Sequence, residues 1–321
     1  MEMTMTNLYK KSTSIMISAI LIGVVFTTIN MPSALASDLC GTTILVDTTL
    51  THNQNCTDAT GGITIGADGV DLDLAGFTID CTESVVGTGY LGSCQGLGTV
   101  GVDTGGFNGV SVTNGTIDGF EIVVRIVGGS ATVANMTITG PTSPGVGFNP
   151  RPASEGIFVS GVACIPGVDP ITGLPTLNTA VNIQGSTIEN HREGIEVHTS
   201  TCVNIHNNTI QNNNSDPVAC FGIVAHDMDN SNIHHNLITM NGESLVGDAG
   251  VDLDSASQGN NIHQNQIIGN FGDGIDFSGD TGGNKVTKNT ITGNSFTDVV
   301  EGGNAVQDNT YIKNTIGTTA Y

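Results

Sequence analysis

A ten-residue string returns several times in the second half of this chain and constrains the fold more than any other feature. It reads NIHNNTIQNN from Asn204, NIHHNLITMN from Asn232 and NIHQNQIIGN from Asn261, with weaker copies from Lys285 and Tyr311. A short unit that is rewritten at a near-constant interval is typical of a solenoid, in which each unit stacks on the one before it. The spacing of the repeat therefore indicates which solenoid the chain can form.

One isoleucine marks each copy, and successive markers are 38, 21, 50, 22, 28, 29, 24 and 25 residues apart. Most steps suit one coil of three short strands, and the two long steps suit a coil with an inserted loop. Five residues before each marker, from Leu74 to Tyr311, stands a position that is nearly always aliphatic. Propeller blades need about 40 residues or more each, so an all-β parallel solenoid of about nine coils is the predicted fold. The markers are Ile79, Ile117, Ile138, Ile188, Ile210, Ile238, Ile267, Ile291 and Ile316.

Asparagines recur at the corners of the predicted coils. A tight bend needs a residue that tolerates the left-handed region, and asparagine is one of the few that does. Stacked coils would bring these side chains above one another, so that their amides hydrogen-bond along the stack. The two series are Asn208, Asn236, Asn265, Asn289 and Asn314, and then Asn213, Asn241, Asn270 and Asn294.

The first 36 residues have the features of a secretory signal peptide. Lys10 and Lys11 precede an apolar run of 12 residues at 15–26, and Ala34-Leu35-Ala36 forms a small-residue cleavage pattern. The run is short for a membrane span, and we expect no transmembrane segment after cleavage, although an uncleaved anchor is the alternative. The mature chain is expected to be secreted, periplasmic or in the cell envelope.

The charge of the mature chain bears on its partners. Without Glu2, Lys10 and Lys11, the 8 basic and 30 acidic residues become 6 and 29, a formal charge of −23. A field of that sign repels nucleic acid, which we therefore do not expect as a partner.

The repeat resembles that of the right-handed parallel β-helix proteins of the pectate-lyase-like superfamily, over about residues 63–316. Residues 40–81 also resemble the opening of many exported bacterial and archaeal β-helix proteins, in which the first residues cap the solenoid. With the signal peptide at 1–36, the resemblance implies an N-terminal cap at 37–62 and a single-stranded right-handed parallel β-helix at 63–321.

All seven cysteines follow the expected cleavage site, where disulfides can persist. Cys164 lies seven residues after Ile157, as Cys202 does after Ile195, so a shared register would bring the two cysteines into disulfide range. Cys40 with Cys56 would close the cap, and Cys81 with Cys94 would cross-link the loop after the first coil. The predicted disulfides are Cys40–Cys56, Cys81–Cys94 and Cys164–Cys202, with Cys220 left over.

Alternation in the first strand of each coil places polar side chains on the outside, and register between coils lines them up. Histidine can act as a base near neutral pH, and stacked carboxylates raise one another's pKa or bind a cation such as calcium. Arg192 and Asp227 border this set as candidate substrate contacts. The candidate catalytic residues, here called the outer strip, are Glu196, His198, His226, Asp252, Asp254 and Asp276.

The resemblance implies that such a strip meets polysaccharide, because lyases, glycosidases and uronan epimerases of the superfamily use it. The sequence departs from each of them. Polyuronate lyases commonly use Arg or Lys to support proton abstraction, but the only arginines of the mature chain are Arg125, Arg151 and Arg192. The Gly-His-Gly motif of polygalacturonases is missing, and so is the Asp-Pro-His motif of mannuronan epimerases. We therefore predict an exported β-helix that binds or processes a neutral or cation-bridged polysaccharide. The alternative is a non-catalytic structural or adhesive solenoid of the cell envelope.

A second histidine series, on the second strand of three successive coils, consists of His206, His234 and His263. Three stacked imidazoles could bind copper or zinc, and the superfamily includes periplasmic copper-associated β-helix proteins, so metal handling is a third hypothesis. Simple polar stacking is the alternative. Three inserts, at 82–100, 141–152 and 164–178, are the candidate walls of a groove over the outer strip.

Overall fold

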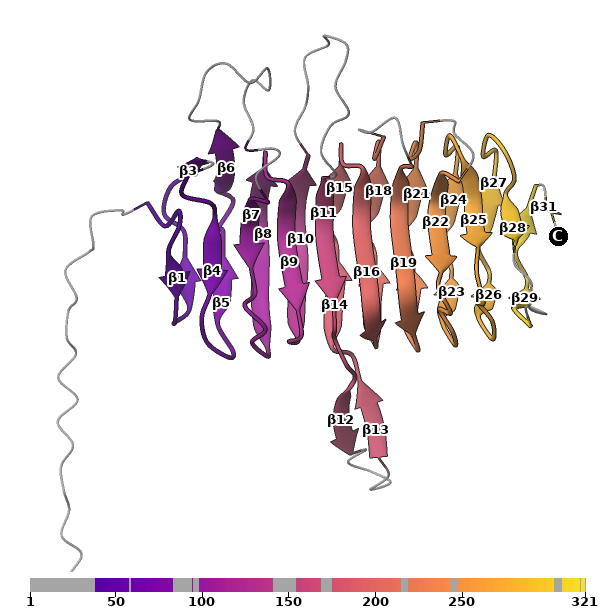
Figure 1. Cartoon of the computed structure of the whole chain (residues 1–321), viewed down its shortest axis with the longest axis horizontal. Coiled ribbons are helices and arrows are strands. Elements are labelled where there is room, and N and C mark those ends of the chain that lie inside the picture. Colours follow the sequence, from indigo (N-terminus) through magenta and orange to yellow (C-terminus); the bar gives the residue numbers. More distant parts are fainter. Residues whose placement is uncertain are drawn as a thin grey trace, which may run out of the picture. The chain divides into compact units, whose positions relative to one another are not determined.

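The computed structural model describes residues 38–57, 59–82, 94, 98–140, 154–168, 175–214, 219–243, 247–302, 308–317 and 319–320. The expected signal peptide lies outside these residues. The described residues form β-strands and no helix, so none of their elements is a membrane-spanning helix. Most coils contribute one strand to each of three parallel ladders, and the strands of the first ladder lie side by side in Figure 1.

The first ladder carries the outer strip on its outward face. It consists of β1 (Thr43–Ile44), β4 (Ile63–Ile65), β7 (Val100–Asp103), β9 (Ile122–Val127), β11 (Glu155–Ser160), β16 (Glu193–Thr201), β19 (Phe221–Asp229), β22 (Ala249–Asp254), β25 (Asp273–Phe277), β28 (Val299–Glu301) and β31 (Thr319–Ala320).

The second and third ladders share two long strands, β8 (Val110–Asp118) and β10 (Ala131–Thr139). The second also contains β2 (Thr48–Thr49), β5 (Asp71–Asp73), β14 (Val181–Gln184), β17 (Val203–His206), β20 (Asn232–His234), β23 (Asn261–His263), β26 (Lys285–Thr287) and β29 (Thr310–Ile312). The third also contains β3 (Gln54–Thr57), β6 (Thr78–Thr82), β15 (Thr187–Glu189), β18 (Thr209–Gln211), β21 (Leu237–Thr239), β24 (Gln266–Ile268), β27 (Thr290–Thr292) and β30 (Thr315–Ile316). An antiparallel hairpin, β12 (Ile165–Val168) with β13 (Pro175–Asn178), leaves the solenoid after β11.

The marker isoleucines form one column through the core. Each pairs with the next, from Ile79 opposite Ile117 to Ile291 opposite Ile316, and those from Ile79 to Ile291 are fully buried. The preceding aliphatic column is also in register, with one correction. Val112 lies opposite Leu72 rather than Leu74, because two extra residues form the turn between β5 and β6.

The asparagine ladders form as predicted, and the amide of Asn208 donates to Asn236, whose amide donates to Asn265. The backbone of these bends differs from the prediction. The residue in the left-handed region is the one before each ladder asparagine, such as His235 with φ 56° and Gln264 with φ 57°. The ladder residue turns its side chain inward, so asparagine is required there for its hydrogen bonds and not for its backbone.

Glycines precede the buried residue of the first strand in five successive coils. A Cβ atom on Gly222 would lie 2.5 Å from the carbonyl oxygen of Gly250 and 2.9 Å from the Nδ2 atom of Asn241. Glycine is therefore needed where the corner asparagine, or His191 in the case of Gly156, packs against the first strand. The column consists of Gly156, Gly194, Gly222, Gly250 and Gly274.

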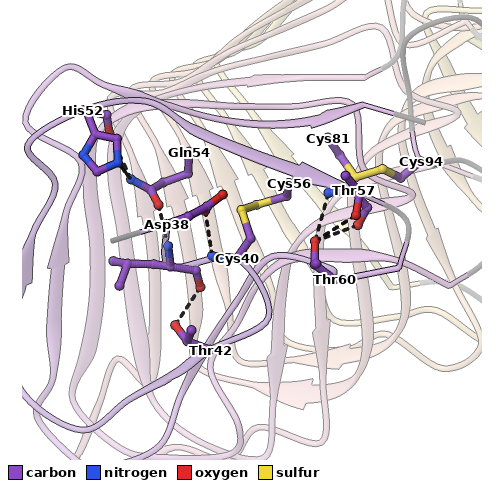
Figure 2. The surroundings of a disulfide bond; sticks show 11 residues. Asp38, Cys40, Thr42, His52, Gln54, Cys56, Thr57, Thr60, Cys81 and Cys94 are labelled. Atoms are coloured by element: carbon purple, nitrogen blue, oxygen red, sulfur yellow. Dashed lines mark hydrogen bonds between the residues drawn. A yellow bond between two sulfur atoms is a disulfide. The ribbon is translucent and has the colours of Figure 1, made fainter. Parts of the chain in front are cut away.

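Three disulfides join the same cysteines that the sequence analysis paired: Cys40–Cys56, Cys81–Cys94 and Cys164–Cys202. Cys220 is buried and forms no disulfide. Figure 2 shows Cys40–Cys56 closing the first described turn of chain, beside Cys81–Cys94 of the following coil. Strands β1 and β2 pair in parallel with β4 and β5, so the segment predicted as a cap continues the ladders of the solenoid.

Candidate functional site

The outer strip has the register that the repeat predicts. Glu196 lies opposite Val224, which lies opposite Asp252, which in turn lies opposite Asp276. The neighbouring row places His198 opposite His226 and His226 opposite Asp254. Strands β16, β19, β22 and β25 lie side by side in the first ladder (Figure 1). Their register and the alternation along each strand therefore place all six side chains on one face.

Two carboxylates that the sequence analysis left out lie beside Glu196. One oxygen atom from each of Glu155, Glu193 and Glu196 lies within 4.8 Å of the others, and Glu193 and Glu196 are nearly fully buried. Arg192 donates a hydrogen bond to Glu193 at 2.7 Å. A signal for the additional members was present in the sequence, because Glu155 precedes Ile157 by two residues as Glu193 precedes Ile195.

The carboxylates of this cluster have different proton affinities. Burial raises the pKa of Glu155 to about 9 and that of Glu193 to about 8, and the charge of Glu196 adds to both shifts. Burial also acts to raise the pKa of Glu196, but hydrogen bonds with Glu193, Glu155 and His198 outweigh it and lower that pKa. At neutral pH the cluster therefore combines two protonated carboxyls with one ionised carboxylate.

A second acidic group lies two coils further on. Burial raises the pKa of Asp252 to about 8, and the charges of Asp276 and Asp254 act in the same direction. The hydroxyl of Ser278 donates a hydrogen bond to Asp252 at 3.3 Å, which opposes the shift only in part. The pKa of Asp276 rises to about 6 through burial and the charges of Asp273 and Asp254. Asp252 is therefore a proton donor at neutral pH.

The two histidines of the strip are close to each other and to carboxylates. His198 contacts Glu196 through Nε2, and its ring centroid lies 4.6 Å from that of His226. The Nδ1 atom of His226 lies 3.5 Å from Asp254. Asp227, predicted to contact substrate, is exposed at the next position along β19.

The second histidine series also stacks in register, but its ring nitrogens do not converge. The rings of His206 and His234 are parallel with centroids 4.8 Å apart, as are those of His234 and His263. The Nε2 atoms of His206 and His234 each contact an asparagine, at 3.0 Å. Burial and the neighbouring imidazoles lower the pKa of His234 to about 4, so it is neutral at pH 7. This geometry favours stacked polar side chains, and metal binding by the series stays a prediction.

Of the three inserts predicted to wall the strip, the second lies outside the described residues and the first lies largely outside them. The third forms the hairpin β12–β13, which borders a cavity of about 680 Å³ next to the second ladder. Ile165 and Thr179 line this cavity together with Asn182, Asn204 and His206. The hairpin is thus associated with the second ladder rather than with the outer strip.

Comparison with known proteins agrees with this architecture. Residues 172–316 match a family model described as a right handed beta helix region. The chain has the fold of a right-handed parallel β-helix. This β-helix resembles the periplasmic alginate epimerase AlgG, with a TM-score of 0.50, 12% identity, and coverage of 87% of this chain and 74% of that chain. A variant of the same epimerase gives a TM-score of 0.54 at the same identity and coverage.

A more distant likeness, with a TM-score of 0.46 and 14% identity, is to the Dettilon tailspike protein, and covers 74% of this β-helix and 44% of that chain. No curated protein matches the sequence. At this identity the AlgG structures establish the fold of the β-helix, and its chemistry has to be inferred from its own residues.

Proposed function

We propose that this β-helix is an exported protein that binds a neutral polysaccharide along the outer strip and hydrolyses it by acid–base catalysis. Asp252 is the acid and Glu196, in contact with His198, is the base. The observation that carries the proposal is the pairing of a protonated carboxyl with an ionised carboxylate in one row of one sheet. Two carboxyl groups whose surroundings push their pKa values apart are the usual arrangement for dividing acid and base roles.

The separation of the two groups favours a particular reaction geometry. Glu196 and Asp252 are two coils apart, which at the strand spacing corresponds to about 9.6 Å between their Cα atoms. This Cα spacing is far above the roughly 5–5.5 Å between the carboxyl groups of retaining glycosidases. It is close to the upper end of the roughly 6.5–9.5 Å of inverting ones, which leaves room for a water molecule. In the proposed step, Glu196 accepts a proton from water as the water oxygen bonds to the anomeric carbon. Asp252 gives its proton to the departing glycosidic oxygen.

The charges on this face favour a neutral substrate. Arg192 bonds to Glu193 and interacts with the ionised Glu196, and Arg125 on β9 is paired with Asp103. Among the described residues of this face, a polyuronate would therefore meet carboxylates of its own sign and arginines that already have an anionic partner. Phe158, opposite Glu196 in β11, adds an apolar ring next to His198, with the centroids 5.6 Å apart. Such a ring is a suitable surface for the apolar face of a sugar.

Two further observations support a location of this β-helix outside the cytoplasm. AlgG, whose fold the chain shares, is a periplasmic alginate epimerase. Three disulfides in a chain of this kind also favour an oxidising compartment outside the cytoplasm.

A binding screen tests the substrate class. The full mature chain is applied to immobilised neutral glucans, mannans and galactans and to alginate and pectin, with and without a chelator. We expect retention on a neutral polysaccharide, weaker retention for Phe158→Ala, and no change for His234→Ala, which alters only the second ladder. Retention on a polyuronate alone, or equal retention of both variants, would contradict the proposal.

A further inference from the structure

We propose that Glu196, His198 and His226 form a binding site for a divalent transition-metal ion such as zinc or copper. One ligand atom from each residue lies within 4.8 Å of the other two. Two imidazoles and one carboxylate are a donor set that suits zinc, copper, nickel and iron and leaves coordination positions open.

The three ligands come from two adjacent strands whose register fixes their approach. Glu196 and His198 are alternate residues of β16, so both face outward, and His226 lies directly opposite His198 on β19. The contact between Glu196 Oε1 and His198 Nε2 shows that these two donors already face each other. Zinc bonds of about 2.0–2.2 Å would require side-chain adjustments of these two donors and of His226, since the three ligand atoms lie within 4.8 Å of one another.

Glu196 presents a nearly buried carboxylate to the two histidines. Its side chain is 9% exposed, and its Oε1 atom contacts Nε2 of His198. A metal ion between Oε1 and the histidines would balance the charge of this carboxylate in a place where little water reaches it. The histidines are 38% and 33% exposed, so an ion can reach the site from solvent.

A neighbouring residue supports the orientation of one ligand. Asp254 Oδ2 lies 3.5 Å from His226 Nδ1, which leaves Nε2 of that ring for the metal. Carboxylates that hold the second nitrogen of a ligating histidine are a common feature of metal sites. Asp254 is therefore a positioning residue in this proposal. The second histidine series lacks such an arrangement, since the ring nitrogens of His206 and His234 contact neighbouring side chains.

The metal site can be tested independently of the proposed hydrolysis, because metal binding is measured without any glycan. If an ion were bound during turnover, Glu196 would be its ligand and metal-bound water would lose the proton instead. Failure of either experiment therefore leaves the other proposal standing.

Isothermal titration of the chelator-treated mature chain with zinc chloride, and electron paramagnetic resonance with copper(II), test the proposal. We expect one ion per chain, nitrogen coupling in the copper spectrum, and binding weakened by more than about 100-fold in His198→Gln and His226→Gln. For Asp254→Asn we expect a loss of about 10–100-fold. The matched control His234→Gln should bind as the wild type does, and circular dichroism verifies that every variant folds.

Three results would overturn the proposal. The wild type could bind no zinc and no copper, or binding could disappear in His234→Gln and persist in His226→Gln. Calcium could displace zinc at equal concentration, which would assign the ion to the carboxylates of Glu155, Glu193 and Glu196 without the histidines.

Discussion

Replacement of Asn236 by alanine tests the physical origin of the stack. The Oδ1 atom of Asn236 accepts hydrogen bonds from the backbone N–H and the side-chain amide of Asn208, at 3.0 and 3.1 Å. Its Nδ2 atom donates to the carbonyl of Ile205 at 2.9 Å and to Asn265 at 3.0 Å. Asn236 is 2% exposed, so water cannot replace these partners.

The substitution Asn236→Ala removes four buried hydrogen bonds. At about 1 kcal/mol for each bond, the free energy of unfolding should fall by about 4 kcal/mol. For a chain of this size, that loss corresponds to a decrease in melting temperature of roughly 8–16 °C. Differential scanning calorimetry measures it, and hydrogen exchange should become faster in β17 and β23, on either side of the altered coil.

Asn232→Ala in the same coil is the matched control. Asn232 is partly exposed and accepts only one long hydrogen bond in the described structure, from Asn261 at 3.4 Å. The melting temperature of Asn232→Ala should stay within about 2 °C of that of the wild type, as is usual for surface substitutions. Equal melting temperatures for the two variants would refute the idea that the buried amides hold the coils together.

Two further predictions concern charge and covalent links. Because the folded pKa of Asp252, about 8, is above its ordinary value of 3.8, its contribution to stability is complete below pH 4 and is lost as pH rises to about 8. Asp252→Asn should therefore raise the melting temperature at pH 8 but not at pH 4, and an unchanged difference across this range would contradict the shifted pKa. Replacing Cys164 and Cys202 by serine opens a link across 38 residues and should cost about 3–4 kcal/mol in denaturant unfolding, whereas an unchanged midpoint would exclude a stabilising disulfide.

The fold and the register were predictable because equivalent residues of successive coils lie at the same distance along the sequence from the marker isoleucine. A fixed offset from the marker isoleucine places His198 opposite His226 without knowledge of the intervening loops. The prediction failed where the offset changes inside a coil, as at Leu74, because the turn before β6 is two residues longer there.

The acidic cluster around Glu196 was harder to predict. Alternation from Ile195 places Glu193 on the inward side, and that side was expected to be apolar. The structure instead buries Glu193 beside Arg192 and Glu155 at the start of the strand. The left-handed backbone position was also predicted one residue too late, at the ladder asparagine instead of the residue before it. The buried side chain of the asparagine decides this, and the period of the repeat does not show which side chains are buried.

Hydrolysis itself is the most direct test of the central claim, and it needs one measurement. Release of reducing ends from the neutral polysaccharide retained in the binding screen is followed by proton NMR for the wild type and Asp252→Asn. We predict a first product with inverted anomeric configuration, activity that falls as pH rises through about 8, and loss of turnover without loss of binding in Asp252→Asn. A product with retained configuration or an unsaturated sugar end, or full activity of Asp252→Asn, would contradict the account.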